Sequence, residues 1–300
     1  MTNIQNIQGK NIISNILMWA INTLKNSNIE SPNINAEILL AHVLSCDRIG
    51  LHTNPEKIID DEDISKYKKL INKRTDRVPL QYITGHVESM SLDFVVDKHT
   101  LIPRQETEIL VETVLNKIKD RALPNKTITI VDIGTGCGNI AISLAANLQN
   151  AQVYASDISR GTLAVAGTNV RRHRVTDRVH LLHGNLFESF DGHLSKGNVD
   201  FIVSNPPYVS EADLNKLEPE IKDHEPLKAL VGGKDGLCFY KRIIREAPEW
   251  LKPEGFLILE VGETQAETIT KLIKTEGHFK NIEITKDLQK IDRIVSARRK

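Results

Sequence analysis

Cysteine is scarce in this sequence, and the few cysteine residues are too widely separated to suggest disulfide bonds. The 300 residues contain three, Cys46, Cys137 and Cys238, and no C-x-x-C pair. An odd number of widely separated thiols excludes a disulfide framework and lacks the spacing of a zinc site. We therefore expect reduced thiols, no bound metal and a cytoplasmic protein.

Net charge and long apolar runs are also missing. The 39 Lys and Arg residues balance the 39 Asp and Glu residues, so no overall field draws the protein to nucleic acid or to an anionic membrane. No stretch approaches the roughly 20 apolar residues of a membrane span, and the N-terminus lacks a signal-peptide pattern. The chain is long enough for about two globular domains. We therefore expect a protein that neither associates with a membrane nor binds nucleic acid stably.

Helical spacing of apolar residues dominates the first part of the chain. Residues 1–10 form a polar, aperiodic lead-in. The second predicted helix is capped by Asn33 or Asn35. The acidic residues 60–63 precede the third predicted helix, where negative charge is favourable. The predicted helices span about residues 13–24, 35–45 and 64–71. We therefore expect residues 1–85 to form a small all-α domain, whose nearly balanced charges do not make it a basic arm.

The pattern then changes to one typical of an α/β domain. Residues 86–104 alternate like a short hairpin that links two domains. Residues 105–300 alternate strands with helices, which predicts a doubly wound, mostly parallel sheet. Strands are expected near residues 128–133, 153–157, 179–182, 201–203 and 256–261, with a terminal hairpin at 282–284 and 294–295.

A stiff turn, Ser204-Asn205-Pro206-Pro207-Tyr208, follows the strand predicted at residues 201–203. The two prolines fix φ and remove two N–H donors, so the Asn205 amide sits in a nearly rigid frame. Its side-chain carbonyl and the Pro206 backbone carbonyl can together accept two hydrogen bonds from one planar NH2 group. Asn-Pro is also common in ordinary surface turns, so the motif gains its weight from the glycine-rich loop upstream.

That loop, Gly134-Thr135-Gly136-Cys137-Gly138, lies between a predicted strand and a predicted helix. Such a loop directs backbone N–H groups and a helix N-terminus at an anionic or carboxylate-bearing ligand. Asp157, about 20 residues further on, is placed to hydrogen-bond a ribose. Asn139 occupies the position of the third glycine of a dinucleotide fingerprint, which favours S-adenosylmethionine over NAD. A glycine-rich structural turn is the alternative, and we interpret Cys137 as a small filler rather than a nucleophile.

Two other groups of polar residues suggest no chemistry. His180 and His183 lie three apart on a predicted strand and point to opposite faces, which argues against a shared metal. The basic cluster at residues 171–174 ends a predicted helix, where cations are locally favourable. We interpret it as a solvated helix end rather than a nucleic-acid contact.

The motifs together carry a family resemblance. Residues 132–138, Asp157 and the turn at 205–208 resemble those of a class I S-adenosylmethionine-dependent amino-methyltransferase. The segments 79–85, 101–108 and 225–230 resemble those of the release-factor glutamine methyltransferases, the HemK/PrmC family, and the resemblance covers nearly the whole chain. It implies a seven-stranded Rossmann-like sheet. It also implies methylation of the side-chain amide nitrogen of the glutamine in the Gly-Gly-Gln motif of class 1 peptide chain release factors.

The resemblance also implies particular site residues. The implied S-adenosylmethionine-binding residues are Gly134, Thr135, Gly136, Cys137, Gly138, Asp157, Asn185, Leu186 and Asn205. The substrate glutamine would be gripped by Asn205 and Pro206 and flanked by Pro207 and Tyr208, with Asn205, Pro206 and Tyr208 as the catalytic group. Asn185 departs from the family pattern, which has an Asp beside the adenine, and His224 replaces the usual aromatic residue before Glu225.

A short Gly-Gly-Gln loop offers a pocket little contact area, so we expect residues 1–85 to dock the body of the release factor. We expect the enzyme to be a monomer. Two rival interpretations share the same motifs. One is an amino-methyltransferase that acts on adenine or guanine of DNA or RNA, against which the neutral charge and the linker motifs argue. The other is a non-catalytic adenosylmethionine-binding protein, against which the intact Asn205 turn argues.

Overall fold

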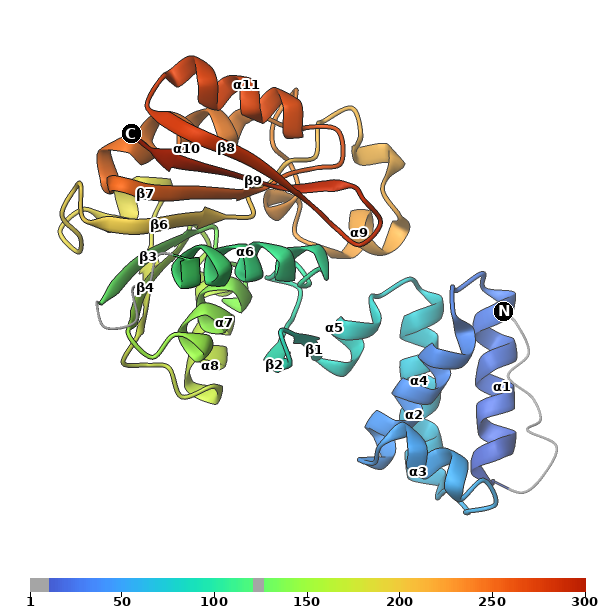
Figure 1. Ribbon diagram of the computed structural model, residues 1–300. Helices are drawn as coiled ribbons and strands as arrows, with labels where there is room; N and C mark the ends of the chain where they lie inside the picture. The colour runs from blue at the N-terminus through green and yellow to red at the C-terminus, as the bar shows by residue number, and fades with distance from the viewer. Residues whose placement is uncertain (1–10, 121–126) are drawn as a thin grey trace. The chain divides into compact units, whose positions relative to one another are not determined.

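The computed structural model describes residues 11–120 and 127–300 (Figure 1). The expected lead-in at residues 1–10 lies outside this range. The chain divides into two compact units, one made of Met1–Gly85 with Pro219–His224 and the other of His86–Glu218 with Glu225–Lys300. No helix in the described part is long and apolar enough to cross a membrane.

The first unit is helical. Its helices are α1 (Ile13–Asn26), α2 (Pro32–Leu44), α3 (Arg48–Thr53), α4 (Asp61–Thr75), α5 (Leu80–Thr84) and α9 (Pro219–His224). Buried apolar side chains surround Tyr67, whose hydroxyl donates a hydrogen bond of 2.8 Å to the carbonyl of Ala36. Asp60 caps α4 by accepting from the N–H of Asp63 at 2.8 Å, so the acidic entry predicted for this helix is confirmed.

The predicted cap of α2 is wrong. The helix begins at Pro32, because proline suits the first helical position, and Ser31 before it has a positive φ of 48°. Asn35 instead lies buried inside the helix, where its Nδ2 atom donates to the carbonyls of Glu30 and Ser31. Its Oδ1 atom accepts from Nε of Arg74 at 2.8 Å. The residue therefore stabilises the helical core rather than the helix end.

Helix α9 belongs to the helical unit although it follows β6 of the other unit in the sequence. Glu220 of this helix accepts hydrogen bonds of 3.1 Å from Arg74 and from Arg77 through its Oε1 atom. Arg74 is buried, so the carboxylate compensates a charge that would otherwise be costly to bury.

The second unit is a seven-stranded sheet with helices on both faces, which confirms the predicted fold class. The strands run in the order β5-β4-β3-β6-β7-β9-β8; the first five are parallel, and β9 is antiparallel to both neighbours. Their bounds are β3 (Ile128–Ile133), β4 (Ala151–Asp157), β5 (Val179–His183), β6 (Val199–Ser204), β7 (Leu251–Glu260), β8 (Phe279–Lys286) and β9 (Asp292–Arg299). The predicted linker hairpin is present as β1 (His86–Ser89) and β2 (Leu92–Val95).

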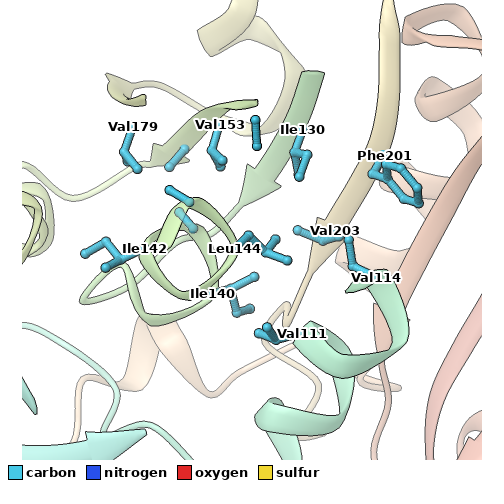
Figure 2. Close-up of a cluster of buried hydrophobic side chains, with 14 of the residues drawn as sticks. Val111, Val114, Ile130, Ile140, Ile142, Leu144, Val153, Val179, Phe201 and Val203 are labelled. Atoms are coloured by element: carbon cyan, nitrogen blue, oxygen red, sulfur yellow. The ribbon is translucent and has the colours of Figure 1, made fainter. Parts of the chain in front are cut away.

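Two apolar layers hold the helices to the sheet. One face carries α6 (Glu106–Asp120), α7 (Asn139–Asn147) and α8 (Arg160–Arg172), and Figure 2 shows Leu144 of α7 and Val114 of α6 close to Val203 of the sheet. The other face carries α10 (Cys238–Trp250) and α11 (Ala266–Glu276). The central strands are buried on both sides, as parallel strands require.

The sheet topology places the predicted motifs together. Ile133 at the end of β3 pairs with Ser156 of β4 and with Ser204 of β6. The chain runs from β3 outward to β5 and then returns to the opposite side of β3, so the strand order reverses between β3 and β6. Ligands of doubly wound sheets bind at the carboxyl ends of the strands beside such a reversal.

Candidate active site

The glycine-rich loop is folded tightly against the end of β4. The N–H groups of Gly134 and Thr135 both donate to the carbonyl of Ser156 at 2.9 Å. Gly138 has a φ of 87°, and a Cβ atom there would lie 3.0 Å from Ile142 in the first turn of α7. A side chain at this position would therefore meet both backbone strain and crowding. Gly134 and Gly136 also have positive φ, and nothing lies within 4 Å of where their Cβ atoms would be, so a ligand can approach the backbone of the loop closely.

A buried acid that is not among the site residues implied by the sequence lies next to this loop. Asp132 is fully buried; its Oδ2 atom accepts a 2.6 Å hydrogen bond from the Thr135 hydroxyl. Its Oδ1 atom has no partner within the described residues. Burial raises the pKa of Asp132 to about 7, although the bond from Thr135 opposes this. The sequence did contain a signal for this residue, because Asp132 is an acid near the end of a strand that leads into a glycine-rich loop.

Asp157 lies at the end of β4, where its carboxylate is fixed by backbone donors. Its Oδ2 atom accepts from the N–H of Gly136 at 3.2 Å and its Oδ1 atom from that of Ser159 at 2.9 Å. Each carboxylate oxygen retains a further lone pair, so the group can still accept from a ribose. Burial raises the pKa of Asp157 above its usual value, and the backbone hydrogen bonds offset only part of that rise.

The residues implied in adenine binding lie at the same edge of the sheet. The N–H of Gly184 donates to the carbonyl of Asp157 at 3.1 Å, which places the segment after β5 beside β4. Asn185 accepts from Nη1 of Arg242 at 3.2 Å. Leu186 is buried, with a φ of 52°. The cationic neighbour of Asn185 was not foreseen, because Arg242 lies on α10, far away in the sequence.

Cys137 fits the interpretation as a filler. Its side chain is buried, and burial raises the pKa of the thiol to about 12, so no thiolate forms near neutral pH. Its carbonyl accepts a 2.9 Å hydrogen bond from the buried Asn169 of α8. The residue therefore contributes packing and a backbone anchor to the loop.

The Asn205 turn is held from several directions. Ser204 donates to the carbonyl of Ile133 at 2.7 Å, and the Asn205 Nδ2 atom donates to the Thr107 hydroxyl at 3.2 Å. The carbonyl of Tyr208 accepts from Gln265 at 3.0 Å. Gly232 packs so closely that a Cβ atom there would lie 2.6 Å from the Pro207 carbonyl. The turn is therefore a rigid frame, as the two prolines predicted.

Tyr208 and Pro206 complete the wall of the turn. Pro206 is buried and Tyr208 is half-buried. Burial raises the pKa of Tyr208 to about 12, with the nearby Glu260 acting in the same direction. The phenol therefore stays neutral and offers an apolar ring with one polar end.

Two distant motifs of the sequence meet near this turn. Glu225 is buried and accepts a 2.6 Å hydrogen bond from Arg104, and it also accepts from the N–H of Ile102 at 3.4 Å. A charge-assisted bond to a buried carboxylate fixes both segments strongly. The motifs at residues 101–104 and 225–227 therefore have a common structural role, because this pairing holds the two segments together.

The other polar residues considered have structural partners. His180 interacts with Gln152 at 2.7 Å, and His183 with the carbonyl of Ile158 at 3.1 Å. In the basic cluster, Arg172 pairs with Asp93 of the hairpin, and His173 bonds the Asp93 carbonyl. All three cysteines are unpaired thiols. Within the described ranges, no group of three or more His, Cys, Asp or Glu side chains could hold a metal ion.

A seven-stranded sheet of this order, with a glycine loop, a carboxylate after the second parallel strand and an Asn-Pro-Pro-Tyr turn at one edge, defines a class I methyltransferase, a class that uses S-adenosylmethionine. The model of the PrmC N-terminal domain matches residues 15–85, and the model of the methyltransferase small domain matches residues 105–220.

Sequence identity to curated proteins identifies the family within this class. The chain is 41% identical to the release factor glutamine methyltransferase of Geobacter sulfurreducens, over 95% of this chain and 96% of that protein. It is 40% identical to that of Clostridium acetobutylicum, over 95% and 98% of the two chains. The chain therefore belongs to the release factor glutamine methyltransferase family.

Solved structures support the fold. The hMettl16 catalytic domain, determined in complex with MAT2A 3'UTR hairpin 6, matches with a TM-score of 0.53 and 17% identity, over 79% of this chain and 82% of that one. At this identity the likeness concerns the fold alone.

Proposed function

We propose that this enzyme transfers a methyl group from S-adenosylmethionine to the side-chain amide nitrogen of the glutamine in the Gly-Gly-Gln motif of class 1 peptide chain release factors. The observation that carries the proposal is the anchored amide of Asn205, in a chain of this family. Because its Nδ2 end donates to Thr107, its Oδ1 end is left to accept from a substrate NH2 group.

The residues at the carboxyl edge of the sheet fit the cofactor. The glycine loop leaves room for close backbone approach, and the carboxylate of Asp157 can accept from a ribose. The unpaired Oδ1 atom of Asp132, buried beneath the loop, suits a ligand that carries a cationic group. Bound there, S-adenosylmethionine supplies an electrophilic methyl group on a sulfonium.

The protein's part in the reaction is mainly alignment. An amide nitrogen is a poor nucleophile because its lone pair is delocalised into the carbonyl. Two hydrogen bonds, to Asn205 Oδ1 and to the Pro206 carbonyl, hold the substrate NH2 and direct its lone pair, and Tyr208 flanks the amide. A rigid frame of this kind lowers the entropic part of the barrier and needs no strong base. The nitrogen can lose its proton after transfer.

Mass spectrometry of a release factor incubated with the enzyme and adenosylmethionine tests the proposal. We expect one added methyl group on the Gly-Gly-Gln glutamine. Asn205→Ala should abolish most turnover while leaving cofactor affinity largely intact, because the loss falls on alignment of the nucleophile. Near-normal turnover of Asn205→Ala would mean that the turn is only structural. Methylation of an adenine-containing oligonucleotide in place of the glutamine would refute the proposed substrate.

We propose in addition that the helical unit docks the body of the release factor. The unit has a shallow apolar hollow between α1 and the segment after α3, lined by Ile13, Ser14, Leu17, Met18, Ile21, Leu51, His52 and Pro55. Met18 at this hollow is 63% exposed, so an apolar side chain at the hollow faces solvent. An exposed apolar patch of this kind is typical of a contact surface for another protein.

A charge placed at the hollow tests docking without removing the unit. Met18→Lys should raise the KM for the intact release factor but leave activity on a short Gly-Gly-Gln peptide unchanged. Ile34→Lys is the matched control, because Ile34 is 45% exposed on α2 and does not line the hollow. Equal KM values for Met18→Lys and wild type would exclude docking at this place.

A further inference from the structure

The peptide group between Tyr208 and Val209 is held at both ends. Its carbonyl, on Tyr208, accepts a hydrogen bond of 3.0 Å from Nε2 of Gln265. Its N–H, on Val209, donates at 2.8 Å to the carbonyl of Leu230. The two partners come from different segments, because Leu230 lies between α9 and α10 and Gln265 directly precedes α11. A peptide group bonded on both sides cannot rotate without breaking a hydrogen bond.

Two glycines pack against the peptide groups on either side of Tyr208. Gly236 has a φ of 72°, and a Cβ atom there would clash with the Tyr208 carbonyl oxygen and lie 2.8 Å from Nε2 of Gln265. A Cβ atom on Gly232 would lie 2.6 Å from the carbonyl oxygen of Pro207, in the preceding peptide group. Both peptide groups are therefore confined, which fixes the backbone angles of Tyr208 and the direction of its side chain.

The Gln265 amide can take only one orientation here. Its Oε1 atom accepts at 3.2 Å from the N–H of Gly262, which can only donate, and its Nε2 end faces the Tyr208 carbonyl, which can only accept. A flipped amide would oppose two donors at one end and two acceptors at the other. A Cβ atom on Gly262 would lie 2.9 Å from Oε1 of Gln265 and 3.3 Å from Cδ2 of Tyr208. Gly262 therefore packs against both the Gln265 amide and the Tyr208 ring.

The two prolines of the Asn205 turn do not supply this constraint by themselves. Each fixes its own φ, which leaves ψ of Pro207 and both backbone angles of Tyr208 to be set by other contacts. A displacement of about 1 Å at a reacting centre can lower a rate by about a hundredfold. A residue beside the reacting amide therefore needs additional contacts that hold it in place.

We propose that Gln265 is a positioning residue of the methyl transfer, which fixes the Tyr208–Val209 peptide group and thereby holds the Tyr208 ring beside the substrate amide. This inference rests on the proposed glutamine methylation, in which Tyr208 flanks the reacting NH2 group. It extends that proposal by naming the side chain that fixes Tyr208. Gln265 needs to touch neither the substrate nor the cofactor.

The first test needs no substrate. The full-length enzyme is labelled with fluorotyrosine, and the 19F NMR signal of Tyr208 is identified among those of the five tyrosines by its absence in Tyr208→Phe. Gln265→Met removes the donor but fills a similar volume. The Tyr208 signal should shift or broaden in this variant, because the ring is no longer held in one place. An unchanged Tyr208 signal would overturn the proposal.

Gln152→Met is the matched control for this measurement. Gln152 is also half-buried, and its Oε1 atom interacts with Nε2 of His180 at 2.7 Å. The His180 ring packs against Tyr154 with a centroid separation of 4.7 Å. Loss of the Gln152 contact should therefore move the Tyr154 signal and leave the Tyr208 signal unchanged. The same change of the Tyr208 signal in both variants would contradict a specific role of Gln265.

The second test uses turnover. Gln265→Met should lower kcat by about ten- to hundredfold with unchanged affinity for adenosylmethionine, and Gln152→Met should keep the wild-type kcat. Gln265→Glu retains the side-chain length and the acceptor for Gly262, but an ionised carboxylate cannot donate to the Tyr208 carbonyl, so kcat should fall at least as far. Normal kcat in either Gln265 variant, or a loss explained by weaker cofactor binding, would overturn the positioning role.

The two proposals fail differently. Absence of glutamine methylation by the wild type would contradict the proposed function, whereas the fluorine signal of Tyr208 tests the positioning role of Gln265 by itself.

Discussion

Asn169 ties three separate segments of the methyltransferase unit together, and its removal gives a measurable loss of stability. The residue is fully buried on α8. Its Oδ1 atom accepts from the N–H of Val95 at 2.8 Å, and its Nδ2 atom donates to the carbonyls of Val95 and Cys137 at 2.9 Å each. One side chain thus links the helix, the linker hairpin and the glycine-rich loop.

The magnitude follows from these contacts. Each hydrogen bond contributes about 0.5 to 1.5 kcal/mol net, and a buried backbone group left without a partner costs about 1 to 3 kcal/mol. Val95 is half-buried, so water can partly replace Asn169 there, whereas the loop around Cys137 is closed. We expect Asn169→Ala to lower the free energy of unfolding of this unit by about 3 kcal/mol and to weaken cofactor binding, because the loop loses its anchor.

The two tryptophans allow this unit to be followed alone. Trp250 packs in the core of the methyltransferase unit and Trp19 belongs to the helical unit, so a Trp19→Phe background leaves one reporter. Urea unfolding of Asn169→Ala is compared with Asn147→Ala, whose side chain makes one local bond to Ser143 within α7. We expect under 1 kcal/mol for that control. An equal, small loss in both variants would refute the proposed tie.

Two further predictions concern the acids near the loop. Asp157→Ala should weaken adenosylmethionine binding by about 1.5 to 3 kcal/mol, while the exposed acid control Asp177→Ala should not; unchanged affinity measured by calorimetry would remove Asp157 from the site. Asp132 has its pKa raised by burial to about 7 in the folded protein, so the folded state keeps a proton that the unfolded chain has lost. Its contribution to stability therefore falls, by up to about 4 kcal/mol, as pH rises from about 4 through 7. Asp132→Asn should flatten this part of the stability curve, and an unchanged slope would show that Asp132 is not the titrating group.

The sheet was predictable from sequence because its strands are buried on both faces. The largely apolar segment 128–133, interrupted by Thr129 and Asp132, predicted β3 with the bounds that the structure has. The glycine loop and Asp157 follow from the strand order, since parallel strands end at one edge. Helix α3 was missed because its six residues are too few to display a helical period.

The parts that sequence could not supply depend on long-range packing. Nothing local predicts that α9 shares a unit with the first helices, because its link to Arg74 and Arg77 forms only in the folded chain. Nothing in the local sequence indicates that Glu260 is buried, because an acidic residue at the end of a mostly apolar strand is usually expected to face solvent. The Asn33 or Asn35 cap failed for a different reason: proline at the first helical position outweighed the preference of asparagine for a cap.

Two buried acids flank the strand that leads into the Asn205 turn. Asp132 lies on β3 and Glu260 ends β7, the two neighbours of β6 in the sheet. Each has one carboxylate oxygen without a partner in the described residues, and burial raises the pKa of each to about 7. Each therefore lowers stability near neutral pH, where an apolar residue of similar size would not. Stability alone does not account for two such positions on both sides of Asn205.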